Sequence, residues 1–291
     1  MGNYLTNLME ELGKLYKLRV LVMSLDSWDR RQRESLLKCL YNLKELETLH
    51  IFAADVSLDF MLGNDWSWTP QRLQRLTPGT SRQTENIFSL NPSSVWSEFS
   101  TFSRLPNWIK PSLNNLSELS IVVNTLPRKD LEVLGALPAL SSLLLHIIKA
   151  CAKQRMEIFN KTADDAEQFR CLSNFKLVSR ASGLVFRDQA MKRLRVLSLS
   201  FSVAETRYVH GDFDLGLEKL TSLKAVDIGI DCRCATPQEV LQAESAIRDS
   251  ISLNASRPSL DLRRHFEREN PWDIPRGMPE PEIIMQELVL I

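Results

Sequence analysis

The sequence has few cysteines, no leader pattern and no long apolar run. Its five cysteines are an odd number without regular spacing, whereas a secreted disulfide scaffold usually has an even, patterned set. The first residues include Glu10 and Glu11 and lack the basic start and apolar core of a signal peptide. No apolar run approaches the roughly 20 residues that a transmembrane helix needs. We therefore expect reduced thiols, a cytoplasmic location and no membrane span.

The chain also lacks an excess of charge of either sign. Lysine and arginine together number 36, and so do aspartate and glutamate, which gives a formal net charge of zero. A protein that binds nucleic acid or an anionic membrane through its overall field is usually strongly basic. The composition therefore favours neither of these partners.

The motifs of common active sites are missing as well. There is no glycine-rich phosphate loop of the Gly-x-x-x-x-Gly-Lys-Ser/Thr or Gly-x-Gly-x-x-Gly type. Cys232 and Cys234 supply two thiols without the further ligands of a zinc site. His210, Asp212 and Asp214 lie close together in the sequence, but no nucleophile motif accompanies them, so we interpret them as a polar loop. We expect no catalytic residue, no cofactor and no metal, and hence no enzyme.

Leucines are abundant and regularly spaced. In the stretch 131–145 they recur every three residues and then every two, as expected when a loop or 3₁₀-like approach leads into a short strand. The same ladder begins near Leu12, Leu37, Leu113 and Leu217, and looser copies lie around 169–177 and 191–199. Repeats of this kind stack into a solenoid. The prediction is an α/β leucine-rich-repeat solenoid, with a curved parallel sheet on the concave side, irregular helices and loops on the convex side, and a C-terminal helical cap.

The ladder also predicts the organisation of the chain. We expect one solenoid over residues 1–262, beginning in mid-repeat without a cap, with an irregular insertion at about 77–100 that is rich in Ser, Thr, Asn and Pro. Residues 29–43 and part of 149–165 are predicted as convex helices. Thr236 and Glu239 form a capping box for a cap helix at 236–252. The proline-containing tail, 263–291, is expected to be flexible.

Strand alternation predicts which side chains face the concave side of the sheet. If Leu21 and Met23 point into the core, their neighbours point outward, and the same register applies to every strand. The candidate protein-binding residues are Val20, Val22, Thr48, His50, Phe52, Glu118, Ser120, Val122, Ser142, Leu144, His146, Lys176, Val196, Ser198, Ser200 and Asp227. This surface is neutral to apolar, whereas a nucleic-acid groove would carry several Lys or Arg. A protein partner is therefore favoured.

Several segments carry a more specific pattern: Phe102–Ile109, Asp130–Leu140, Ser182–Phe186, Val209–Leu223, Ile228–Cys234 and Pro258–Leu262. They resemble the C-terminal leucine-rich repeats and terminal cap of grass coiled-coil, nucleotide-binding, leucine-rich-repeat disease-resistance proteins. The resemblance covers nearly all of residues 12–268. The 291 residues contain neither the coiled coil nor the nucleotide-binding domain of that family.

The resemblance implies a function in plant defence. In that family the repeat domain recognises a pathogen effector, or a host protein that the effector alters, and restrains the nucleotide-binding domain. Three alternatives remain open at this point. The chain could be a general leucine-rich-repeat signalling scaffold, a truncated remnant without signalling, or, less in keeping with the missing leader, an extracellular receptor domain.

Overall fold

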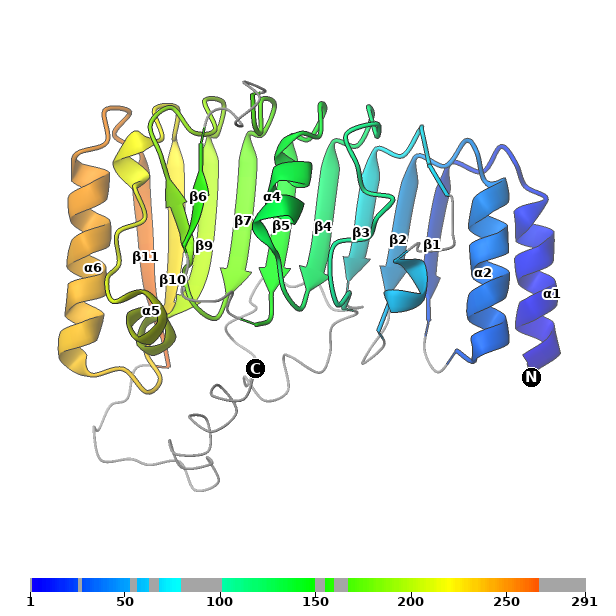
Figure 1. Cartoon of the computed structure of the whole chain (residues 1–291), viewed down its shortest axis with the longest axis horizontal. Coiled ribbons are helices and arrows are strands. Elements are labelled where there is room, and N and C mark those ends of the chain that lie inside the picture. The colour runs from blue at the N-terminus through cyan, green and yellow to red at the C-terminus, as the bar shows by residue number, and fades with distance from the viewer. Residues whose placement is uncertain are drawn as a thin grey trace.

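The computed structural model describes residues 2–25, 28–52, 57–62, 68–79, 101–149, 155–159 and 167–266. In these residues one parallel sheet of nine strands runs the length of the molecule, in the order β1-β2-β3-β4-β5-β7-β9-β10-β11 (Figure 1). The strands are β1 (Val20–Ser24), β2 (Thr48–Phe52), β3 (Arg75–Gly79), β4 (Glu118–Val123), β5 (Ser142–Ile147), β7 (Asn174–Ser179), β9 (Val196–Ser202), β10 (Ala225–Asp231) and β11 (Ser259–His265). The predicted α/β leucine-rich-repeat solenoid is confirmed.

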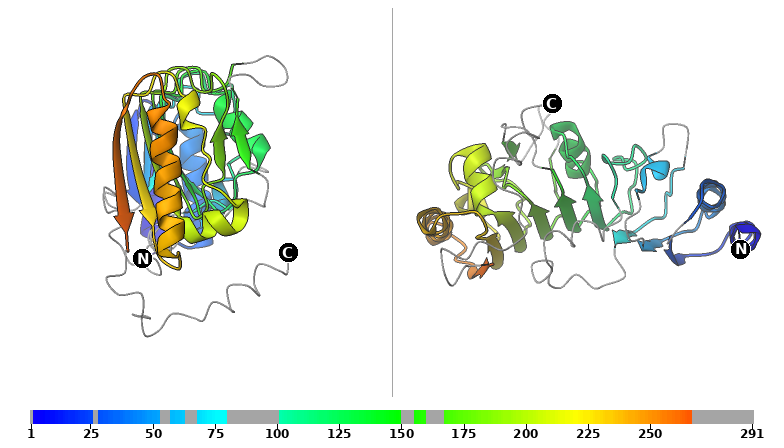
Figure 2. Two further views of the ribbon diagram at one scale, coloured as in Figure 1. Left: turned by 90° about the vertical axis from the view of Figure 1, so that its left-hand side faces the viewer. Right: turned by 90° about the horizontal axis from the view of Figure 1, so that it is seen from below.

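Helices and a second, smaller sheet cover the convex side (Figure 2). The helices are α1 (Gly2–Gly13), α2 (Arg30–Asn42), α4 (Arg128–Gly135), α5 (Val203–His210) and α6 (Pro237–Ser252), with the 3₁₀ turns η1 (Asp59–Met61) and η4 (Leu217–Lys219). The second sheet pairs β6 (Met156–Ile158) with β8 (Leu184–Phe186) in parallel.

The leucine ladder forms the core because the strands pair in register. Leu143 of β5 lies opposite Leu119 of β4 and Phe175 of β7, so the apolar position of each strand stacks on that of the next. All three side chains are at most 2% exposed. Burial of a leucine contributes roughly 2 kcal/mol, so each added repeat extends one continuous core.

Capping boxes begin helix α2, near the N-terminal end of the stack, and helix α6, at its C-terminal end. Asp29 accepts the backbone N–H of Gln32, whose side chain accepts the N–H of Asp29, and α2 starts there. Thr236 and Glu239 do the same at α6, with Pro237 at the first helical position. The helix predicted at 236–252 is thus α6, and β11 follows it as the last strand.

The region between β2 and β4 is irregular, but its core is well packed. Leu73 and Leu76, which are spaced by three residues as in the leucine ladder, are buried, and Leu76 lies in β3. The Trp68 ring packs edge-on against Trp108, with centroids 4.8 Å apart, and the Trp108 indole N–H donates to the Met61 carbonyl at 2.8 Å. Trp68 therefore packs the core and is not part of a recognition surface.

Several predicted boundaries are wrong. The insertion predicted from residue 77 overlaps β3, which continues to Gly79, and residues 80–100 lie outside the described residues. β11 extends to His265, three residues beyond the predicted end of the solenoid, and 267–291 lie outside the described part. The described residues of the expected convex helix at 149–165 include a strand, β6, and the approach to β5 contains an α-helix, α4. Residues 156–158 form a strand because they pair with β8, which lies about one repeat further along the chain.

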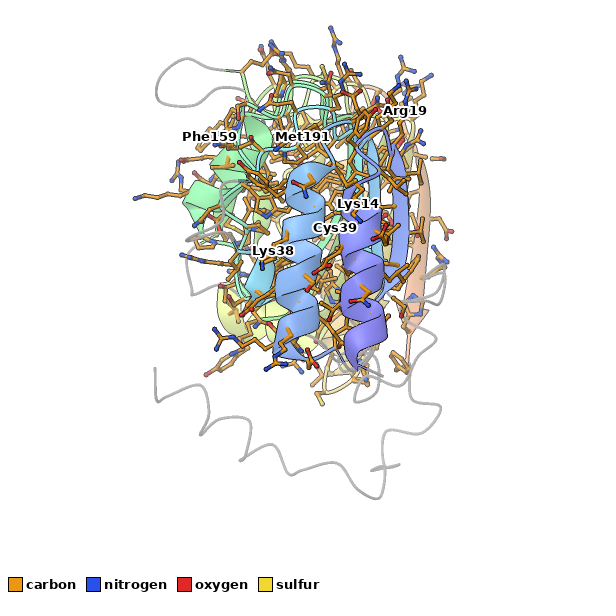
Figure 3. The ribbon with its side chains drawn as sticks, turned by 90° about the vertical axis from the view of Figure 1, so that its right-hand side faces the viewer. Lys14, Arg19, Lys38, Cys39, Phe159 and Met191 are labelled. Carbon is orange, nitrogen blue, oxygen red and sulfur yellow. The ribbon has the colours of Figure 1, made fainter. Side chains whose placement is uncertain are left out.

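The N-terminal end also differs from the open repeat that we expected. The helix α1 lies past β1 and packs beside α2 (Figure 3). A side chain added at Gly13 would touch the Cys39 backbone at 3.4 Å, and Met9 is only 2% exposed. Leu8 remains 38% exposed. The helix thus shields part of the apolar end that the ladder alone would leave uncovered.

Serine hydroxyls connect the central repeats where the strands begin. Ser117 Oγ donates to the Gln74 carbonyl at 3.1 Å, Ser141 Oγ to the Ser117 carbonyl at 3.0 Å, and Ser173 Oγ to the Ser141 carbonyl at 3.1 Å. The backbone N–H groups of the same serines bond to the same carbonyls. Serine is small enough to reach back to the preceding turn, so this ladder fixes the spacing of neighbouring repeats.

Removing the serine ladder should weaken the stack. We expect Ser141→Ala to lower the free energy of unfolding by about 1 kcal/mol, the usual net contribution of one hydrogen bond. The measurement is urea denaturation followed by circular dichroism. Ser245→Ala on the exposed face of α6 is the control and should cost little, because its hydrogen bond to Asp249 at 3.2 Å is exposed to water and alanine is the better helix former. Equal stability of the two variants would contradict a structural role for the ladder.

Candidate protein-interaction face

The strands form the concave side of the solenoid (Figure 2), and their outward residues form three rows across the sheet. The strand register sets the rows, because equivalent residues lie opposite one another. The first row is Val20, Thr48, Arg75, Glu118, Ser142, Asn174, Val196, Ala225 and Ser259. The second is Val22, His50, Thr77, Ser120, Leu144, Lys176, Ser198, Asp227 and Asp261.

The third row lies near the ends of the strands. It includes Phe52, Val122, His146, Val178, Ser200, Gly229 and Arg263. Every candidate residue named from the sequence lies in one of these three rows. The described structure thus brings all of them together on one face of the sheet.

The first two rows are accessible. Val20, Val22 and Val196 are 55%, 57% and 42% exposed, which is unusual for β-branched apolar side chains on a folded surface. Leu144, in the second row, is half-buried. Serine, threonine and asparagine lie between these four apolar side chains, together with the ion pair of Arg75 and Glu118. The accessible surface is therefore largely uncharged.

Most charges on this face are paired with each other. Arg75 Nε lies 3.0 Å from Glu118, and the Arg263 guanidinium contacts Asp227 and lies 3.4 Å from Asp261. Exposed pairs of this kind contribute little to stability. Because they neutralise one another locally, the concave face presents no net field of either sign to a partner.

A hydrogen bond between two side chains lies at the N-terminal end of the concave face. His50 Nδ1 and Thr77 Oγ1 are 2.5 Å apart, and the His50 ring lies 6.4 Å from that of Phe52. Thr77 was not among the residues named from the sequence, because we had assigned it to an insertion. Arg75 was missed because the repeat register between residues 52 and 105 was not assigned from the sequence, although the Leu73 and Leu76 spacing could have set it. Arg263 was missed because β11 is longer than expected.

Three of the named residues are on the predicted face but are buried. Val122, His146 and Ser200 are 4%, 0% and 6% exposed, so they are not available to a partner in this structure. All three belong to the third row, where Val178 is also buried. Strand alternation decides the side of the sheet on which a residue lies, whereas exposure depends on packing in the folded chain. The accessible candidate face is therefore formed by the first two rows.

Burial strongly affects the charge of His146. Removal from water disfavours the imidazolium and lowers the pKa of His146 to about 4. The side chain is consequently neutral at physiological pH and acts as part of the packed interior. It does not supply charge to the concave face.

The remaining titratable motifs have structural partners. Arg155 donates to the Asp214 carbonyl at 2.8 Å and the Asp212 carbonyl at 3.1 Å, and it pairs with the Asp212 carboxylate at 2.5 Å. The loop that holds these carboxylates is thereby tied to the segment of β6. Burial lowers the pKa of His210, and the positive charge of Arg155 lowers it further. The interpretation of 210–214 as a polar loop agrees with this role.

A metal site requires several ligands close together, and a membrane span requires a long apolar helix. No group of three His, Cys, Asp or Glu side chains is placed to hold a metal ion there. Cys232 is buried and Cys234 exposed, and both are free thiols. None of the described helices is both long and apolar enough to cross a bilayer.

The buried histidine makes stability depend on pH. The folded-state pKa of His146 lies below the ordinary value of 6.5, so its contribution is complete above pH 6.5 and is lost as the pH falls to 4. The loss amounts to roughly 3 kcal/mol. We expect His146→Gln to flatten this part of the stability profile, measured by urea denaturation at several pH values. A variant as acid-sensitive as the wild type would contradict the assignment.

The comparison with known families agrees with the architecture. A family model described as a leucine-rich repeat region matches residues 2–260, which span almost the whole described chain. The extended concave surfaces of stacked repeats are binding surfaces for other proteins. The chain is thus a protein-interaction module, and it belongs to the leucine-rich repeat family.

Proposed function

We propose that this chain is the repeat domain of an intracellular plant immune receptor, and that its concave face binds a protein. That partner is a pathogen effector, a host protein altered by an effector, or the nucleotide-binding domain of a receptor that the repeats restrain. The proposal places the chain in the cytoplasm and assigns it no catalytic step. Its finer part rests on the sequence resemblance to grass disease-resistance proteins.

The observation that carries the proposal is the composition of the first two rows. Exposed Val20, Val22 and Val196 lie beside small polar residues, with the acidic and basic side chains largely paired. The cores of protein interfaces are depleted of net charge in the same way. A nucleic acid would instead require unpaired Lys or Arg along the groove, where Lys176 is the one basic side chain of the first two rows without an ion pair to a described residue.

A general signalling scaffold would use the same face. It differs in its partner, since a scaffold would bind host regulators and would not dock on a receptor core. The discriminating experiment must therefore use the nucleotide-binding domain as the probe.

We expect the chain to co-precipitate with nucleotide-binding domains of related receptors. The double variant Leu144→Glu, Val196→Glu should lose this binding, because each glutamate replaces an apolar side chain with a carboxylate that loses its water when the contact forms. Truncation or charging at an interface centre commonly costs 2 kcal/mol or more, about a thirtyfold loss of affinity.

The control variant carries the same change on the convex side. Tyr208→Glu in α5 and Leu241→Glu in α6 replace side chains that are 65% and 58% exposed. It should bind like the wild type. Absence of binding by a folded wild-type chain would rule out docking on the receptor core, and equal loss in both variants would rule out the concave face.

A further inference from the structure

The turns that lead into the strands form one long rim of the solenoid, the upper one in Figure 1. Six exposed basic side chains occupy the turns before β7, β9, β10 and β11. We call them the basic rim: Arg170, Lys192, Arg193, Arg195, Lys224 and Arg257. Residues 170–173, 191–195, 220–224 and 253–258 contain no aspartate or glutamate.

The charges of the basic rim are not compensated. None of the six forms an ion pair with a described residue, and Arg170 Nε donates to a neutral group, the Pro138 carbonyl, at 3.1 Å. In the N-terminal half of the same rim some basic side chains are paired, since Lys14 lies 2.5 Å from Glu11 and Arg72 lies 2.7 Å from Glu45. Lys17, Lys44 and Lys110 form no ion pair with a described residue there. The C-terminal half differs because six unpaired charges lie in four neighbouring turns.

Strand pairing concentrates this charge. The Arg195 N–H bonds to the Ser173 carbonyl and the Lys224 N–H to the Arg195 carbonyl, both at 2.8 Å, so neighbouring turns lie directly against each other. Adjacent strands are about 4.8 Å apart, which places the four turns within roughly 15 Å. Figure 3 shows Met191, which lies in one of these turns, and Arg19 of the first repeat towards the same rim. The six basic side chains therefore produce a local positive field that attracts polyanions, although the net charge of the whole chain is zero.

The other side chains of these turns indicate which anion fits. Leu253, in the last turn, is 74% exposed, the highest value among the large apolar side chains of the described residues. The turns contain no Tyr, Trp or exposed Phe on which a nucleobase could stack. Cationic side chains beside an exposed leucine match the interface of a bilayer, where the cations meet headgroups and the leucine enters the acyl boundary.

We propose that the basic rim binds the surface of a bilayer containing anionic phospholipids. Binding is peripheral and leaves the concave face free, because the rim and the first two rows are different surfaces. The inference is independent of the immune function proposed above. It rests on a local cluster of charge, whereas the net charge of zero describes only the chain as a whole.

The test is sedimentation with vesicles of phosphatidylcholine and phosphatidylserine, compared with pure phosphatidylcholine. We expect the wild type to bind the anionic vesicles at low ionic strength and to dissociate at high ionic strength. Each basic side chain near an anionic leaflet strengthens binding by about fivefold, so Lys192→Glu, Arg193→Glu, Arg195→Glu should weaken it by at least about a hundredfold.

The matched control changes the net charge equally on the convex helices. Arg31→Glu, Lys38→Glu, Lys129→Glu replaces exposed basic residues of α2 and α4, and Figure 3 shows Lys38 below the rim. This variant should bind vesicles severalfold more tightly than the rim variant. Failure of the wild type to bind anionic vesicles, or equal weakening of the two variants, would overturn the proposal.

A second pair of measurements distinguishes a membrane from a nucleic acid. The variant Leu253→Asn keeps every charge of the rim, and asparagine is tolerated at the end of a helix. Because only the apolar contact is removed, this variant should bind vesicles more weakly but with the same dependence on salt. A single-stranded RNA oligonucleotide is the competing probe. Binding of RNA but not of vesicles by the wild type would refute the membrane assignment, and so would a Leu253→Asn variant with unchanged vesicle affinity.

Discussion

The structure depends on the in-register pairing of parallel strands over a continuous row of leucines. Each strand is short and could not remain folded alone, since it has one apolar face and two open edges. Stacking provides partners for both, because Leu143 covers Leu119 and is covered by Phe175 while the backbone of each turn bonds to the preceding one. The serine ladder of Ser117, Ser141 and Ser173 reinforces the same spacing. The remaining elements are arranged around this repeat.

One consequence is that residues at the same position of successive repeats lie side by side and form a continuous surface. Outward residues of the strands form the concave face, and the residues just before the strands form a rim. The first is nearly free of net charge, because Arg75 pairs with Glu118 and Arg263 with Asp227. The second is strongly basic in its C-terminal half. The molecule therefore has two surfaces of different chemistry.

Departures from the repeat are local and have tertiary causes. The pairing of β6 with β8 on the convex side replaces a helix that the sequence favoured, and Arg155 ties this small sheet to the loop of Asp212 and Asp214. At the N-terminal end, α1 packs on α2 through the close approach of Gly13 to Cys39. Neither contact joins residues that are close in sequence, so neither leaves a periodic signal.

The sequence by itself determined the fold class, most of the strands and the side of the sheet on which each candidate residue lies. Leucine periodicity is a local property, and alternation along a strand is fixed by backbone geometry. Tertiary structure alone decided exposure, pairing and the distribution of charge. It buried Val122, His146 and Ser200, and it added Arg75, Thr77 and Arg263 to the concave face. It also gathered six basic residues from distant turns onto one rim, because the strand spacing brings together residues separated by one repeat of sequence.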